Sequence, residues 1–175
     1  MELEVPEAPW AAAVLLHPHP SFGGDRHNIV VDALFRALPS AGVAALRFDF
    51  ASPDVAACAA QAVAALDALD VRPLVLAGYS FGAEVASNVA DERLAGWALI
   101  APPTLDEQLG ADSRPKLVLA AAHDQFAPPD RLVQRTSQWA STSVEIIEAA
   151  DHFLAGATRR VAERVVEWLR ERTGR

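Results

Sequence analysis

Residues 73–90 read PLVLAGYSFGAEVASNVA, an apolar run that passes into a helical pattern through the turn at 78–82. That turn, Gly-Tyr-Ser-Phe-Gly, matches G-x-S-x-G, the pattern of a sharp strand-to-helix turn that lifts a serine hydroxyl clear of a sheet. The glycines two residues before and after Ser80 remove Cβ atoms that would clash where strand and helix close together. The alternative is a glycine-rich turn without chemistry, so the rest of the chain has to supply the partners of Ser80.

Short apolar runs alternate with helical patterns on both sides of this turn. The expected strands are 11–16, 43–48, 73–77, 97–100, 116–121 and 144–147, with a short edge strand at 3–5. The expected helices are 28–40, 55–69, 83–90, 129–139 and 157–172. This alternation predicts an α/β fold, a mostly parallel sheet of about six strands with right-handed crossovers and helices on both faces. We expect residues 1–175 to form a single domain.

Composition excludes several classes of partner. The net charge of −8 and the lack of a basic stripe argue against nucleic acid. No apolar run reaches the roughly 18 residues of a membrane-spanning helix. Cys58 is the only cysteine, and the acidic start at residues 1–4 lacks the basic residues of a signal peptide. We therefore expect a cytoplasmic protein whose partner is a small molecule rather than a nucleic acid or a membrane.

Polar and titratable residues follow the expected strands, at the sheet edge where ligands bind in such folds. Ser80 needs a base, because a free hydroxyl is a weak nucleophile, and His152 in the loop after the last strand is the predicted base. Asp124, after the fifth strand, is predicted to orient the imidazole of His152. The alternatives are an exposed loop histidine for His152, and a helix N-cap or an Asx turn for Asp124. Asp49 is a spare acid, whereas Asp151 is a poor orienting partner because neighbouring side chains on an extended segment diverge.

The loop after the first strand reads HPHPSFGG over residues 17–24. An acyl-transfer reaction needs backbone N–H donors for its oxyanion, and the N–H of Phe81 at the start of a helix is one candidate. Pro18 and Pro20 have no N–H. The remaining candidates for the second donor are His19, Ser21, Phe22 and the glycines. A rigid turn without this role is the alternative. Histidines two residues apart, without a nearby cysteine or acidic ligand, do not predict a zinc site, and we expect no metal or organic cofactor.

These motifs resemble those of the small, lidless α/β-hydrolases related to dienelactone hydrolase. The resemblance rests on HPHPxxGG at 17–24, LRFDF at 46–50, LAGYSFGA at 76–83 and ADHF at 150–153. It extends from about residue 11 to the end of the chain. It implies an α/β-hydrolase fold and a Ser-His-Asp triad that acts through an acyl-enzyme. It also implies that His19 supplies the second oxyanion N–H.

The chain departs from this family in two loops. After the second strand, residues 51–54 replace a longer glycine-rich loop and lead directly into a helix. Residues 102–114 are too few for a lid domain, and the helix usual in that segment is expected to be missing. We therefore expect a shallow, open site. Dienelactone hydrolase itself uses a cysteine nucleophile, so its substrate does not carry over to a chain with Ser80.

The leading hypothesis is a serine esterase or thioesterase that acts on a small or medium acyl group. The residues expected to line the acyl site are Phe22, Tyr79, Phe126 and Phe153. One alternative is a non-catalytic scaffold of the same fold that binds a ligand or partner, because a fold does not fix a function. The other alternative is an acyltransferase that uses the same triad.

Overall fold

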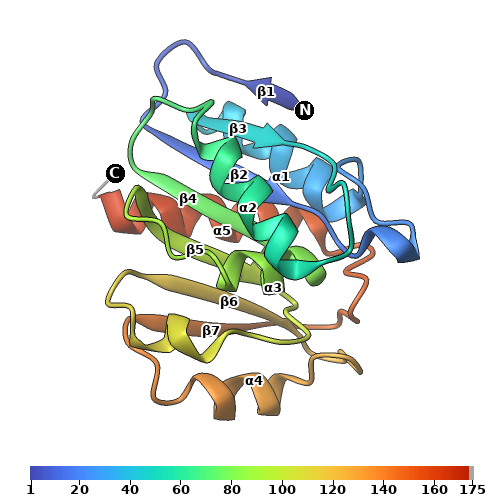
Figure 1. The fold of residues 1–175 in the computed structure, drawn as a ribbon. Coiled ribbons are helices and arrows are strands. Elements are labelled where there is room, and N and C mark those ends of the chain that lie inside the picture. Colours follow the sequence, from blue (N-terminus) through green and yellow to red (C-terminus); the bar gives the residue numbers. More distant parts are fainter. Residues whose placement is uncertain (174–175) are drawn as a thin grey trace.

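The computed structural model describes residues 1–173, which form one seven-stranded sheet flanked by helices (Figure 1). The strands are β1 (Glu2–Glu4), β2 (Ala11–Leu16), β3 (Val43–Arg47), β4 (Leu74–Tyr79), β5 (Leu94–Ile100), β6 (Lys116–Ala121) and β7 (Thr142–Ile147). The α-helices are α1 (Ile29–Ser40), α2 (Val55–Leu66), α3 (Phe81–Ser87), α4 (Pro129–Thr136) and α5 (Thr158–Thr173). Two short 3-10 helices are η1 (Pro20–Phe22) and η2 (Glu107–Ala111).

The sheet order is β1-β3-β2-β4-β5-β6-β7, and every pair is parallel except β1 with β3. The predicted α/β class with a mostly parallel sheet is confirmed. The chain passes from β2 to β3 through α1 and from β3 to β4 through α2, and crossovers of this kind place helices on both faces of the sheet (Figure 1). The central strand β4 ends at the turn that carries Ser80.

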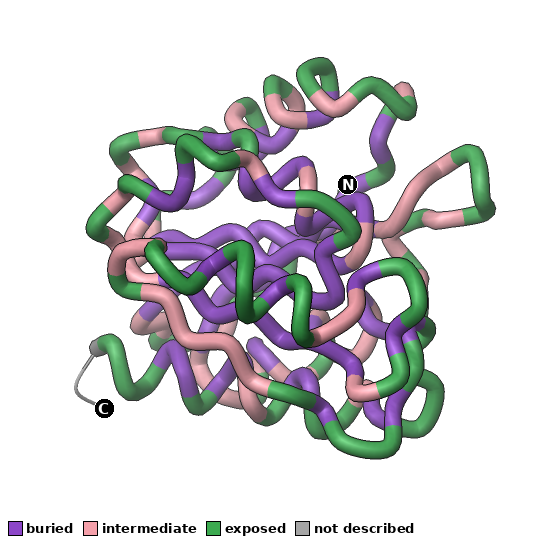
Figure 2. The backbone as a smooth tube through the Cα atoms, turned by 90° about the horizontal axis from the view of Figure 1, so that it is seen from below, coloured by how far each residue is buried: buried purple, intermediate pink, exposed green. Residues whose placement is uncertain are grey.

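The sheet is buried between two helical layers. Alternate residues of β2 face opposite sides: Leu15 packs in the cluster with α1 and α5, whereas Leu16 packs in the cluster with α2, α3 and α4. A strand covered on both faces has no position for a polar side chain, which explains why its sequence is apolar throughout. In Figure 2 the buried strands accordingly lie at the centre, with exposed residues on the outer turns of the helices.

Several element boundaries differ from the sequence expectation. β4 continues through Gly78 to Tyr79 because both residues pair with β5, opposite Leu99 and Ile100. α2 ends at Leu66, and the next three N–H groups form tighter turns with carbonyls three residues back. The expected edge strand at 3–5 is shifted by one residue, since Leu3 pairs with Leu46 in β3.

The connection from β5 to β6, residues 101–115, contains only η2. The described chain therefore has no lid over the carboxyl ends of the strands, as the length of this segment predicted. The loop from β3 to α2 is also short, so the edge of the sheet stays open. None of the helices in residues 1–173 combines the length and the apolar character needed to cross a bilayer.

Candidate active site

Ser80 lies at the junction of β4 and α3 in a strained backbone conformation, with φ 53° and ψ −120°. Its N–H still donates to the carbonyl of Ile100 at 2.8 Å, so the ladder with β5 holds the turn. A Cβ at Gly78 would lie 2.1 Å from the carbonyl oxygen of Gly82, and a Cβ at Gly82 would lie 2.1 Å from that of Leu16. Only glycine fits at either position, and this close packing brings the start of α3 against the end of β2.

A continuous hydrogen-bond network joins Ser80, His152 and Asp124. The Oγ of Ser80 is 3.0 Å from Nε2 of His152, and Nδ1 of His152 is 2.7 Å from Oδ2 of Asp124. The three residues come from the ends of β4, β7 and β6, which meet at one edge of the parallel sheet. The structure thus brings together the three side chains that the sequence proposed as nucleophile, base and orienting acid.

The carboxylate of Asp124 is buried and fully hydrogen-bonded. Its Oδ1 accepts from the N–H groups of Phe126 and Ala127, both at 2.8 Å, while Oδ2 faces His152. Burial alone would raise the pKa of Asp124, but the hydrogen bonds from His152, Ala127 and Phe126 outweigh it and hold the pKa below its usual value. Asp124 therefore forms an Asx turn and faces the imidazole at the same time, so these two sequence interpretations are compatible, whereas the N-cap of α4 is Pro128.

The loop that carries His152 is tied to the sheet from two sides. The hydroxyl of Tyr79, buried at the end of β4, donates to the carbonyl of His152 at 2.9 Å. The N–H of His123 donates to the carbonyl of Ala150 at 2.9 Å, which joins this loop to the one with Asp124. Burial, together with the charges of Asp124 and Asp151, raises the pKa of Tyr79 to about 12, so the hydroxyl stays protonated as a donor.

Of the candidate second donors in the loop at residues 17–24, one backbone N–H makes no hydrogen bond within the described residues. The N–H groups of Ser21, Phe22, Gly23 and Gly24 all donate inside the loop, to His19 or Pro20. The N–H of His19 is left, and the ring of His19 lies 4.7 Å from that of Phe81. Of the donors that the sequence left open, His19 is thus the one available to a ligand beside Ser80.

His17, which sequence reasoning did not assign a role, anchors this loop. Its Nε2 accepts from the N–H of Phe50 at 2.9 Å, and its Nδ1 is 2.6 Å from the carbonyl of Pro18. Nδ1 must therefore carry the proton. Burial lowers the pKa of His17 and favours this neutral form. The imidazole joins the end of β2 to the segment after β3, a contact between residues 33 positions apart that no local pattern reveals.

The other two carboxylates considered from the sequence, Asp49 and Asp151, are not hydrogen-bonded to His152 or Ser80 within the described residues. Asp49, the spare acid, binds Arg26 through both the backbone N–H and the guanidinium. Asp151 accepts from the N–H of Phe153 in a local turn at 3.0 Å. Asp124 is accordingly the carboxylate that faces the imidazole.

A cavity of about 530 Å³ opens over Ser80. All four residues expected to line an acyl site, Phe22, Tyr79, Phe126 and Phe153, line this cavity, as do His19, Phe81 and His152. Sequence reasoning missed Asn28, Pro103 and Glu84. The spacing of Glu84, four residues after Ser80 on α3, is a signal that could have found it, because such residues share one side of a helix.

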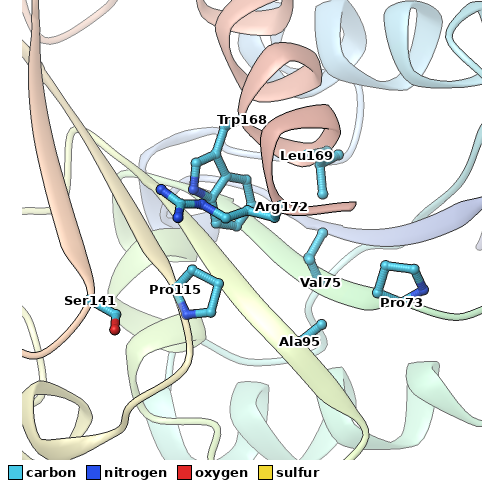
Figure 3. Close-up of a pocket in the computed structure, with 8 residues that line it drawn as sticks. All are labelled: Pro73, Val75, Ala95, Pro115, Ser141, Trp168, Leu169 and Arg172. Atoms are coloured by element: carbon cyan, nitrogen blue, oxygen red, sulfur yellow. The ribbon is translucent and has the colours of Figure 1, made fainter. Parts of the chain in front are cut away.

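A second hollow, of about 320 Å³, lies at the opposite, amino-terminal ends of the strands (Figure 3). It is lined by Pro73, Val75, Ala95, Pro115, Ser141, Trp168, Leu169 and Arg172. Figure 3 shows Trp168 and Arg172 extending from α5, and Pro73 and Pro115 at the strand starts. None of the predicted site residues is among them.

Comparisons with solved structures agree with the observed fold. No family model matches the chain. It is 28% identical to an uncharacterized protein of Rickettsia prowazekii, in an alignment that covers 94% of this chain and 79% of that protein. An alpha-beta serine hydrolase homologue from Coxiella burnetii is 26% identical, with a TM-score of 0.82 over 95% of this chain and 89% of that one.

Two further solved structures share the fold. A protein of unknown function from Agrobacterium tumefaciens, considered an α/β-hydrolase, is 26% identical with a TM-score of 0.84, covering 99% of this chain and 91% of that one. A serine hydrolase without a lid from Xanthomonas campestris is 24% identical with a TM-score of 0.66, covering 93% and 87%. Together with the parallel sheet, the strand-to-helix turn at Ser80 and the short β5–β6 connection, these likenesses identify the fold as that of the small α/β-hydrolases without a lid.

Proposed function

We propose that this hydrolase is a serine esterase or thioesterase that cleaves a small or medium acyl group from its alcohol or thiol. The observation that supports the proposal is the row of hydrogen bonds from Ser80 through His152 to Asp124, with distances of 3.0 and 2.7 Å. We also propose, from the motifs alone, a relation to the dienelactone hydrolases, and from the lone Cys58 a cytoplasmic location.

In the proposed reaction, Oγ of Ser80 attacks the substrate carbonyl while Nε2 of His152 takes the hydroxyl proton. Asp124 holds the imidazole in the tautomer with hydrogen on Nδ1 and stabilises the positive charge that develops on the ring. The depressed pKa of Asp124 keeps the carboxylate ionised for this role at neutral pH.

The carbonyl oxygen becomes an oxyanion between the N–H of His19 and the N–H of Phe81. Backbone donors fixed by folding need no reorganisation as the charge appears, which is the main source of such stabilisation. The anchoring of the loop by His17, and the fit of Gly82 against Leu16, support a fixed distance between the two donors.

His152 then returns its proton to the leaving alcohol or thiol, and the acyl group stays on Ser80 as an ester. A water molecule, deprotonated by His152, attacks this ester and releases the carboxylic acid and the free serine. The proposed partner is thus a small-molecule ester or thioester, and the proposed chemistry needs water besides the side chains and backbone groups of the chain.

The test is turnover of p-nitrophenyl esters and acyl thioesters by the wild type and by Ser80→Ala. We expect hydrolysis by the wild type and only background hydrolysis by the variant, with an unchanged circular dichroism spectrum. Equal rates in the two proteins would rule out the proposed nucleophile. Faster product formation with an added alcohol, without free acid, would instead indicate acyl transfer.

A further inference from the structure

The walls of the cavity over Ser80 are aromatic. The ring of Phe22 lies 4.9 Å from that of His19 on one side, and the ring of Phe126 lies 4.9 Å from that of His152 on the other. Phe153 adds a further ring, 6.5 Å from Phe126. The cavity is thus suited to an apolar body, with a flat ring as the best fit because aromatic pairs favour edge-to-face and offset contacts.

These rings are unusually open to water. Phe22 is 87% exposed, Phe126 57% and Phe153 58%. Three exposed rings around one cavity form an apolar patch of the kind that marks a binding site. A bound acyl group would cover them and remove that surface from water, which favours apolar substrates over polar ones.

Glu84 is the one acidic side chain that lines this cavity, and no lysine or arginine of the described residues lines it. Its carboxylate makes no ion pair or hydrogen bond within the described residues, because the bonds of Glu84 run through its backbone N–H and carbonyl. The residue is only half-buried. An uncompensated negative charge thus faces the space where the substrate binds.

We propose that the site selects esters or thioesters of uncharged, apolar acyl groups, preferably aromatic ones, and that Glu84 rejects acyl groups that carry a carboxylate. This inference rests on the proposed esterase function and specifies its substrate class. An anionic acyl group would meet the like charge of Glu84 and would find no lysine or arginine on the cavity wall to offset it.

The alternative explanation of Glu84 is purely structural. A carboxylate in the first turn of a helix interacts favourably with the helix dipole, and Glu84 occupies such a position in α3. That interaction changes the stability of the fold but treats two substrates alike. A role in selection instead changes the ratio of the kcat/KM values for the neutral and the anionic substrate. Salt should lower this ratio, because it screens the charge of a partly exposed group.

The experiment compares two esters that differ by one carboxylate, p-nitrophenyl phenylacetate and its 4-carboxy derivative. We expect wild type to have a much higher kcat/KM for the neutral ester. In Glu84→Gln the ratio of the two kcat/KM values should fall about tenfold, the effect of one like charge at close range. In wild type, but not in Glu84→Gln, the ratio should also fall as salt is raised.

Glu92→Gln is the matched control, since it removes the same charge at an exposed position outside the cavity and should leave the ratio unchanged. Ser80-dependent hydrolysis with the same ratio in wild type and Glu84→Gln would overturn this inference alone. A preference of wild type for the anionic ester would do the same. Absence of Ser80-dependent hydrolysis of either ester would overturn the proposed function, and this inference with it.

Discussion

The backbone of Ser80 lies in the left-handed half of φ space, at φ 53°, where a residue with a side chain is destabilised by about 1–3 kcal/mol. The hydrogen bond from its N–H to Ile100 and the two bonds that its carbonyl accepts from Ala83 and Glu84 hold this conformation. The strain has a geometric result, because it places Oγ at 3.0 Å from the imidazole of His152.

Asp124→Asn should lower kcat by about a thousandfold or more, because an amide cannot stabilise the imidazolium and can favour the wrong tautomer of His152. Asp151→Asn is the matched control, since that side chain caps a local turn and does not face the imidazole. Steady-state kinetics on one ester would measure both variants. Similar losses in the two would contradict the assignment of Asp124.

At the scale of single residues, the sequence predicted the site residues that directly follow an expected strand. Ser80, Asp124 and His152 each follow an apolar run, and the structure places them within hydrogen-bonding distance. Their catalytic roles stay predictions for the experiments above. The contacts of His17 with Phe50 and of Tyr79 with the His152 carbonyl join residues 33 and 73 positions apart. Such contacts depend on how loops pack together, which no local pattern encodes.

At the scale of elements, the site depends on α3 lying directly against the end of β2. A Cβ on Gly82 would lie 2.1 Å from the carbonyl oxygen of Leu16 and 2.8 Å from that of His17. Neither backbone atom can move without shifting the loop at residues 17–24. The position of this loop relative to Phe81 is therefore set by the absence of one methyl group.

Gly82→Ala should destabilise the fold by more than about 2 kcal/mol, since alanine would have to push backbone atoms apart. The sign of this change is informative, because a glycine-to-alanine substitution inside a helix ordinarily stabilises a protein by roughly 0.5–1 kcal/mol. Urea unfolding followed by circular dichroism would measure the change. A Gly82→Ala protein as stable as wild type would contradict the close packing of α3 on β2.

The alternation of elements was predictable because its cause is local: strands buried on both faces are apolar throughout, and helices repeat about every 3.6 residues. Boundaries were less predictable. Gly78 and Tyr79 belong to β4 because β5 offers them Leu99 and Ile100 as partners. That pairing depends on register between strands, which an apolar run alone does not specify.

For the molecule as a whole, the acidic composition is balanced locally by arginine pairs at the amino-terminal side of the sheet. The Arg114 guanidinium binds Asp112 and the carbonyls of Asp91 and Leu94. Its hydrogen bond with Asp112 is the main reason that the pKa of that carboxyl falls to about 2. Asp91, paired with Arg93, has a pKa of about 2 for the same reason.

Asp112→Asn should therefore cost about 1–2 kcal/mol of unfolding free energy at neutral pH, from the difference between the folded and unfolded pKa values. A depressed folded pKa stabilises above the unfolded pKa of about 4, and this contribution disappears as pH falls toward the folded value of about 2. The difference in the free energy of unfolding between wild type and Asp112→Asn should thus become smaller as pH falls from neutral to about pH 3.

Urea unfolding at neutral pH and at about pH 3 would measure the difference in the free energy of unfolding between wild type and Asp112→Asn. Asp70→Asn is the control, since Asp70 is an exposed carboxylate without an ion pair in the described part of the chain. A difference that stays constant with pH would contradict the ion-pair explanation and would point to a structural effect of the amide.

The central claim is that the fold assembles an activated serine at Ser80, and chemical labelling tests it without knowledge of the substrate. Wild type and Ser80→Ala would be treated with a fluorophosphonate and analysed by intact mass and peptide mapping. We predict one adduct, on Ser80, that is absent from the variant. A folded wild-type protein without an adduct, or with one on another residue, would contradict the account and favour a binding scaffold of the same fold.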